Sequence, residues 1–242
     1  MLVASVAAAA SSPPPDEDAD STPGTEGEDA GAALLEKDGP RAPAPAASLV
    51  AEATRIVTTA KATTYSHKTF VDEEALRFDV DCSGFVGYLL RRVAPQARRE
   101  LVAGTVKRPL AKHFVSFIEG LPQEGAGHWR RIDDARALQA GDLIAWTRAP
   151  DSKSTNTGHV MLVAGPPAPH GAHAVDVPIF DSTALKHGKT DRRAAAAPSG
   201  VGRGTITLRI DRAGKPPAFR WSPTGTYRYH ETEIVMARVR AE

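Results

Sequence analysis

The chain has 242 residues, 41% of them hydrophobic, which is enough for one sizeable core and favours one globular domain with a tail. Its formal charge of +1 is unevenly distributed, because residues 11–47 carry nine acidic and two basic side chains, which leaves 28 basic and 20 acidic side chains elsewhere. The single cysteine excludes an intrachain disulfide and a zinc site built from several cysteines.

The N-terminal part of the sequence predicts an export signal followed by a disordered linker. Residues 1–12 begin with an apolar run that ends in small residues, as a truncated secretory signal would, so we expect a periplasmic, envelope or secreted protein. Residues 13–47 are rich in Pro, Gly, Ala and acidic side chains, and we expect a disordered linker whose charge serves solubility. Since no stretch is apolar enough for a membrane helix, we expect no integral membrane segment.

Residues 48–242 predict one α+β domain in which helices precede strands. Ser48 can cap a helix with one apolar face, and a second apolar stripe from Phe85 to Val93 begins directly after Asp81-Cys82-Ser83-Gly84. Short helices are expected between residues 95 and 121, broken by Pro and Gly. Short β-rich segments then follow, at residues 143–146, 159–163, 174–180, 204–210, 218–221 and 232–239.

Cys82 is predicted in the first turn of its helix. Unpaired backbone N–H groups and the helix dipole stabilise a thiolate there, and the same N–H groups can hold an oxyanion. A lone cysteine is more often inert packing, so a nucleophile needs a proton carrier nearby. His159 is the candidate, because it opens an apolar strand after a polar loop, although such a histidine alone would be read as an exposed polar residue. A carboxylate at Asp81 would oppose the thiolate unless it turned away to cap the helix, and we expect capping.

Three segments carry a resemblance to a known family. Asp81-Cys82-Ser83-Gly84-Phe85-Val86, Gly141-Asp142-Leu143-Ile144-Ala145-Trp146 and Thr157-Gly158-His159-Val160 resemble, in order and spacing, the signatures of NlpC-type cell-wall cysteine peptidases. The resemblance implies a papain-like fold, with N-terminal helices that carry the cysteine packed on an antiparallel sheet. It also implies a histidine on a neighbouring strand and a third polar residue on the strand after that. This third place falls at Asp181, and His187 is the second choice, since we expect it to lie past the strand.

Further residues are candidates for binding substrate. Tyr65 resembles the tyrosine that precedes the cysteine in the family, and ordinary packing is an equally weighted reading; the residues after it, Ser66-His67-Lys68, differ from the family's pattern. Ser83, Trp146 and His187 are the other candidates, and Trp146 is either core or cleft wall. The segments Asp191-Arg192-Arg193 and Gly200-Val201-Gly202-Arg203-Gly204 could together close over a cleft. Their arginines could bind a substrate carboxylate, but solvated surface charge is the favoured interpretation.

The resemblance implies a cysteine hydrolase that cleaves an amide bond through a thioester, with peptidoglycan stem peptides or another peptide or amide as substrate. Cys82 would attack, His159 would protonate the leaving amine, and Asp181 would orient His159. The alternatives are a thiol-dependent acyltransferase and a non-catalytic cell-wall-binding or interaction domain of the same fold. No cofactor or metal is expected, since the eight histidines form no helical ligand pair, and no nucleic-acid partner is expected, since only net charge favours one.

Overall fold

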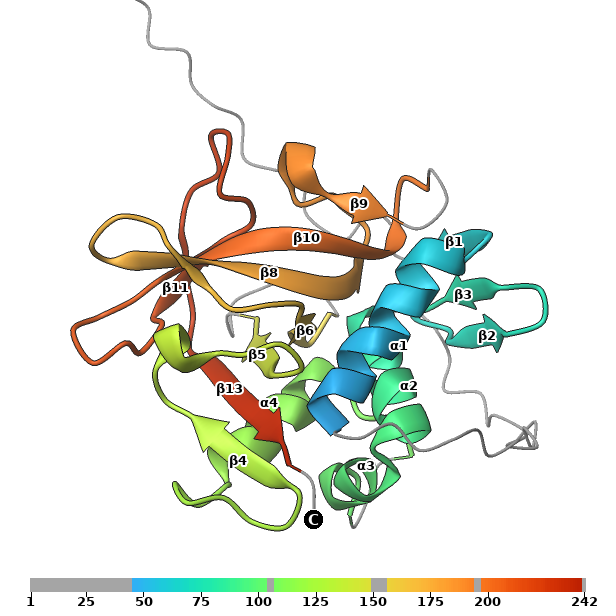
Figure 1. Cartoon of the computed structure of the whole chain (residues 1–242), viewed down its shortest axis with the longest axis horizontal. Coiled ribbons are helices and arrows are strands. Elements are labelled where there is room, and N and C mark those ends of the chain that lie inside the picture. Colours follow the sequence, from blue (N-terminus) through green and yellow to red (C-terminus); the bar gives the residue numbers. More distant parts are fainter. Residues whose placement is uncertain (1–44, 104–106, 149–155, 194–196, 241–242) are drawn as a thin grey trace, which may run out of the picture.

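The computed structural model describes residues 45–103, 107–148, 156–193 and 197–240. The predicted signal segment and the predicted linker up to residue 44 lie outside these ranges. The described residues form a mixed α+β structure (Figure 1), as predicted. Its helices are α1 (Pro45–Thr59), α2 (Cys82–Val93), α3 (Pro95–Leu101) and α4 (Ala111–Glu119), with 3₁₀ turns at η1 (Ala135–Ala137) and η2 (Gly188–Thr190). Helix α1 begins at Pro45, three residues before the predicted Ser48, because proline is tolerated in a first helical turn.

The strands form two sheets. The larger sheet is antiparallel throughout and has the order β12-β11-β10-β8-β6-β5-β13-β4, with β7 beside β8 and β9 beside β10. The smaller sheet has the order β1-β3-β2 and directly precedes α2 in the chain. The strands are β1 (Ala62–Thr64), β2 (Phe70–Asp72), β3 (Arg77–Asp79), β4 (Trp129–Ile132), β5 (Leu143–Thr147), β6 (Gly158–Val163), β7 (Ala168–Pro169), β8 (Ala174–Thr183), β9 (Arg192–Arg193), β10 (Gly200–Arg209), β11 (Ala218–Arg220), β12 (His230–Glu231) and β13 (Ile234–Val239).

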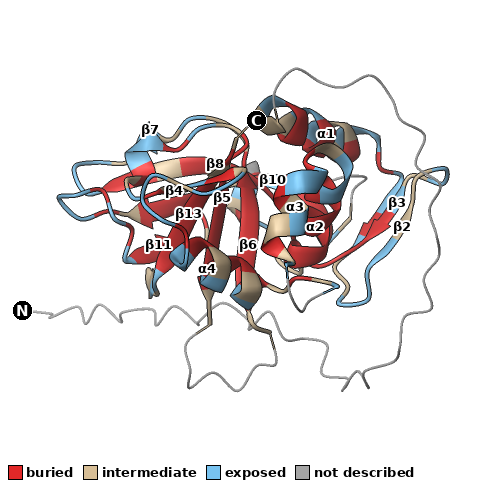
Figure 2. Ribbon diagram, turned by 90° about the horizontal axis from the view of Figure 1, so that it is seen from below, coloured by how far each residue is buried: buried red, intermediate tan, exposed pale blue. Residues whose placement is uncertain are grey.

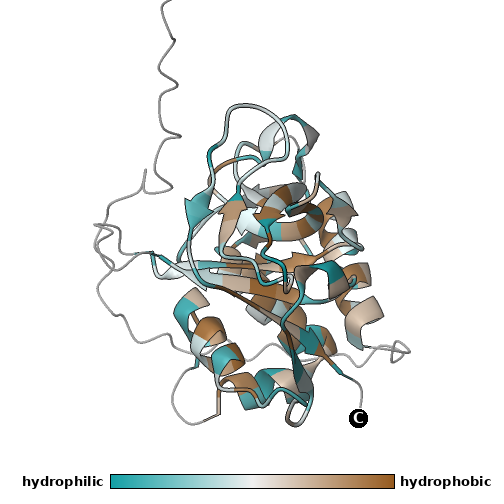
Figure 3. Ribbon diagram, turned by 90° about the vertical axis from the view of Figure 1, so that its left-hand side faces the viewer, coloured by the Kyte–Doolittle hydropathy of each residue, from teal (hydrophilic) through white to brown (hydrophobic). Residues whose placement is uncertain are grey.

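The larger sheet separates two hydrophobic clusters. Because side chains alternate along a strand, Val160 and Leu162 of β6 pack with helix residues such as Leu89, whereas Met161 and Val163 belong to a second cluster on the other face. Figure 2 shows buried residues along the strands and on the inner sides of α1 and α2, and Figure 3 shows the same strands as the most hydrophobic part of the molecule. By this alternation His159 lies on the face away from the helix cluster, as does Asp181 of β8, which follows Ile179 of the second cluster by two residues.

A turn before β5 fixes the entry of the chain into the sheet. Gly141 has φ +92°, and a Cβ atom there would lie 2.6 Å from backbone atoms of Ala46 in α1. Asp142 is fully buried; it accepts hydrogen bonds from the Gln139 N–H at 2.7 Å and from Arg238 Nε and Nη2, both at 2.8 Å. Gly141 and Asp142 therefore form a structural turn that leads into β5.

No helix among the described residues is long and apolar enough to cross a membrane.

Candidate active site

Cys82 is the first residue of α2, and Asp81 is its N-cap, as predicted. Asp81 Oδ1 accepts from the Gly84 N–H at 2.6 Å and from Ser83 Oγ at 2.9 Å. The N–H groups of Cys82 and Ser83 lie in the first turn, where a helix supplies no carbonyl partner for them. They are therefore suitably placed to stabilise negative charge beside the thiol.

The second carboxylate oxygen of Asp81, Oδ2, interacts with Arg108 and His67 and not with the thiol. Arg108 donates to Asp81 Oδ2, and His67 Nδ1 lies 3.4 Å from the same oxygen. Burial alone would raise the pKa of Asp81, but the hydrogen bond with His67, the charge of Arg108 and the Gly84 N–H together lower it. Asp81 thus stays ionised, and its charge is largely balanced by Arg108.

The Cys82 thiol and the His159 imidazole are neighbours in the protein interior. Cys82 is 3% exposed and His159 2% exposed, and the thiol faces the Gly158 carbonyl, with an Sγ–O distance of 4.0 Å. Burial would lower the pKa of His159, but the charge of a Cys82 thiolate and the hydrogen bonds with Asp181 and Cys82 raise it well above its ordinary value. The arrangement therefore favours a protonated imidazole at His159, next to the Cys82 side chain.

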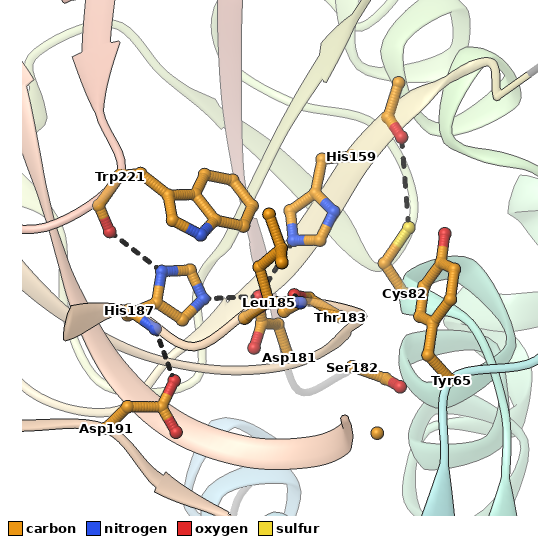
Figure 4. A network of polar contacts seen from close by, with 12 residues as sticks. Tyr65, Cys82, His159, Asp181, Ser182, Thr183, Leu185, His187, Asp191 and Trp221 are labelled. Carbon is orange, nitrogen blue, oxygen red and sulfur yellow. Dashed lines mark hydrogen bonds and ion pairs between the residues drawn. The ribbon is translucent and has the colours of Figure 1, made fainter. Parts of the chain in front are cut away.

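Asp181 holds the other side of the His159 ring (Figure 4). His159 Nε2 lies 2.9 Å from Asp181 Oδ2. The other ring nitrogen, Nδ1, is therefore the one that is free to exchange a proton with the thiol. Burial would raise the pKa of Asp181, but the charge of His187, the hydrogen bonds of both histidines and the charge of Arg193 hold it far below its usual range. The carboxylate is thus ionised and orients the imidazole.

Alternate residues of β8 tie the helix to the sheet at this point. Asp181 points to His159 on one face, whereas Ser182 points to the other face and donates to the Val80 carbonyl at 2.6 Å. Val80 lies two residues before Cys82. The same strand therefore fixes both the start of α2 and the carboxylate that orients His159.

The sequence favours Asp181 over His187 as the third polar residue and predicts that His187 lies past the strand. The chain does leave β8 after Thr183, but it turns back, and His187 Nε2 lies 2.8 Å from Asp181 Oδ2. The side chain is fully buried, so it contacts the carboxylate rather than an open substrate surface. Both imidazoles thus share one carboxylate oxygen (Figure 4).

The favoured interpretation of Arg193 as solvated surface charge is wrong. Its side chain is 1% exposed, donates to Asp191 Oδ2 at 2.8 Å and to the carbonyls of Leu185 and Gly200, and lies 3.8 Å from Asp181 Oδ1. Strand β9 pairs with β10 there, and this pairing turns Arg193 inward toward Asp181. Arg193 therefore supports the site from behind the carboxylate.

The predicted binding residues have different surroundings. Tyr65 is half-buried, and its hydroxyl accepts from Asn156 Nδ2 at 3.5 Å, while Asn156 Oδ1 accepts from the Gly158 N–H at 3.3 Å. This chain of contacts links Tyr65 to the residue whose carbonyl faces the thiol. Ser83 is buried, and its hydroxyl is committed to Asp81.

Trp146 lies directly opposite His159 in the β5–β6 pairing, with the ring centroids 5.5 Å apart. It is 5% exposed and stacks on Phe219 at 4.2 Å, so it belongs to the second hydrophobic cluster. Trp221, which was not predicted, lies 5.2 Å from the His159 ring and stacks on His187 at 4.5 Å. No local motif marks Trp221; only its place at the end of the predicted strand 218–221 hints at an inward ring.

Within the described residues, no group of three or more His, Cys, Asp or Glu side chains is arranged to hold a metal ion.

Comparison with known proteins finds a protein of similar sequence whose name states no activity. No family model matches the chain, and no solved structure matches it. The chain is similar to "Uncharacterized protein R653" of Acanthamoeba polyphaga mimivirus, with 29% identity over 172 residues that cover 64% of this chain and 73% of that protein.

Proposed function

We propose that the protein is a cysteine hydrolase of the papain-like, NlpC type that cleaves an amide bond through a thioester. The observation that carries the proposal is the placement of the chain's single cysteine at the start of α2, beside a buried imidazole that is held by a buried carboxylate. A cysteine that only filled space in the core would need neither partner.

Each group has a defined step in this reaction. The Cys82 thiolate attacks the carbonyl carbon, and the N–H groups of the first turn of α2 stabilise the resulting oxyanion. His159 gives its Nδ1 proton to the leaving amine as the C–N bond breaks and the thioester forms. Water then attacks the thioester, with His159 as base, which releases the acid and restores the thiol. Asp181 keeps the His159 ring in the tautomer and orientation that these proton transfers need.

Peptidoglycan stem peptides are the substrate class that we propose. The resemblance of the segments around Cys82, Trp146 and His159 to NlpC-type peptidases supports this choice, and so does the excess of basic over acidic side chains after residue 47. Such a positive domain favours association with an anionic cell envelope.

An acyltransferase is the second candidate, and the burial of the site favours it. Cys82 and His159 are both nearly inaccessible, and a thioester shielded from water can persist until an amine or hydroxyl acceptor arrives. The two reactions share the first half and differ only in the group that releases the acyl chain.

Incubation with purified peptidoglycan and its soluble stem peptides, followed by mass spectrometry, tests these functions. A hydrolase yields a new amine and a new carboxylic acid, and an acyltransferase yields a transferred acyl group when hydroxylamine is added. The Cys82→Ser variant should form no product, while the exposed His173→Gln variant should match the wild type. Product formation by Cys82→Ser, or wild-type binding without any product, would contradict the proposal.

A further inference from the structure

His187 has two hydrogen-bond partners that can only accept. Its Nδ1 lies 2.9 Å from the Trp221 carbonyl oxygen, and its Nε2 lies 2.8 Å from Asp181 Oδ2. A carbonyl has no proton to give, so Nδ1 carries one. An ionised carboxylate also only accepts, so Nε2 carries a proton as well. With both ring nitrogens protonated, the His187 side chain is an imidazolium.

The charges around His187 favour the same protonation state. The charged groups in contact with it are Asp181 of β8 and Asp191, which accepts from the His187 backbone N–H at 2.6 Å. Arg193 of β9 joins both carboxylates, and its side chain is 1% exposed. Two carboxylates and one guanidinium leave an excess negative charge in a buried site, whereas a protonated His187 makes the cluster neutral. The Cys82–His159 ion pair adds no net charge.

The remaining neighbours of the ring suit a buried cation. The Trp221 indole stacks on His187, with centroids 4.5 Å apart and planes inclined by 28°, a geometry in which an aromatic face stabilises positive charge. On β10, a Cβ atom at Gly204 would lie 2.7 Å from His187 Cβ and Cδ2. The absence of a side chain at Gly204 is therefore what leaves room for the ring.

We propose that His187 is an imidazolium that positions Asp181 for His159. Its role in catalysis rests on the proposed cysteine chemistry, but its protonation state does not. Asp181 Oδ2 receives N–H groups from both histidines, whereas Oδ1 has no hydrogen-bond partner and lies 3.8 Å from Arg193. His187 therefore supplies the second hydrogen bond that keeps the carboxylate aimed at His159. It is a positioning residue, since it touches neither the thiol nor the reacting atoms.

Nuclear magnetic resonance of the protein with ¹⁵N-labelled histidine tests the protonation state without any need for activity. The signal assigned to His187 is the one absent from His187→Gln. We expect both ring nitrogens to be protonated at pH 7, with two slowly exchanging protons. One unprotonated ring nitrogen at pH 7 would overturn the proposal, whatever the fate of the proposed hydrolase.

The pH dependence of Cys82 alkylation tests the positioning role. Removal of a buried cation disfavours the thiolate, so in His187→Gln the pH of half-maximal labelling should rise by about one unit, a roughly tenfold slower reaction below that pH. Gly204→Ala should shift the profile in the same direction, because the added methyl displaces the His187 ring. The His173→Gln control should leave it unchanged. An unshifted profile in folded His187→Gln or Gly204→Ala would overturn the positioning role, even if the resonance spectra showed an imidazolium.

Discussion

Replacement of Asp81 by Asn should separate helix capping from charge at the candidate active site. Asparagine is as good an N-cap as aspartate, so the hydrogen bond from the Gly84 N–H should persist. What is lost is the charge-assisted bond to Arg108, whose side chain is 36% exposed and therefore partly screened. We expect Asp81→Asn to lower the free energy of unfolding by about 1 kcal/mol at pH 7. Asp81→Ala should cost about 1 kcal/mol more, since it also removes the cap.

The pH dependence of this stability difference has a definite sign. Burial opposes the shift, but His67, Arg108 and the Gly84 N–H lower the pKa of Asp81 below its value of ~3.9 in an unfolded chain. The stabilisation is therefore fully present above about pH 4 and is lost as the pH falls through the folded-state pKa. The difference between wild type and Asp81→Asn should therefore shrink as the pH falls below 4.

Urea unfolding and thiol alkylation together test these effects. Because the neutral amide removes a negative charge beside the thiol, Asp81→Asn should be alkylated faster than the wild type at pH 6. Asp134→Asn is a matched control, since Asp134 caps η1 and also pairs with a nearby arginine. Slower alkylation of Asp81→Asn, or a stability difference that grows below pH 4, would refute the reasoning.

Three further substitutions test the packing of the site. Gly158 has φ +136°, and a Cβ atom there would lie 2.0 Å from the Trp146 carbonyl oxygen. Gly158→Ala should therefore weaken the β5–β6 pairing and slow Cys82 alkylation at pH 7. An unchanged melting temperature and an unchanged labelling rate would contradict this. Leu89→Ala should lower the free energy of unfolding in urea by about 2–5 kcal/mol, since Leu89 is fully buried, and a loss well below 1 kcal/mol would show a loose core. Asp181→Ala should lower the free energy of unfolding in urea by about 3–5 kcal/mol, because it leaves Arg193 buried without this carboxylate. No change in the free energy of unfolding would mean that the buried cluster is not ionised.

Local sequence patterns predicted the parts of the site that depend on local structure. Asp81 caps α2 because a carboxylate three residues before an N–H group reaches it without help from the rest of the fold. His159 was predicted because it opens an apolar run, and Asp181 because the family resemblance places a polar residue directly after another such run; His159 lies on β6 and Asp181 on β8. The three-residue strands of the smaller sheet were not predicted, since segments so short show no periodicity.

The environment of His187 depended on contacts that no local pattern reveals. After β8, Thr183 Oγ1 donates to the Leu185 carbonyl at 2.5 Å and accepts from the Leu185 N–H at 2.8 Å, which reverses the chain. Gly188, with φ +75°, completes the turn. Arg193 is buried only because β9 pairs with β10 opposite Gly202. These are tertiary effects, and the spacing of His187 and Arg193 from Asp181 gives no indication of them.

The central claim, that Cys82 and His159 form a thiolate–imidazolium pair, is tested most directly by the pH dependence of Cys82 alkylation. The chain has no other cysteine, so the labelling signal belongs to one site. The account predicts rapid labelling of the wild type below pH 7 and a large loss of that labelling in His159→Ala, with His173→Ala unchanged. Labelling that is slow below pH 7 in the wild type, and no slower in His159→Ala, would mean that Cys82 is a buried structural thiol and would contradict the account.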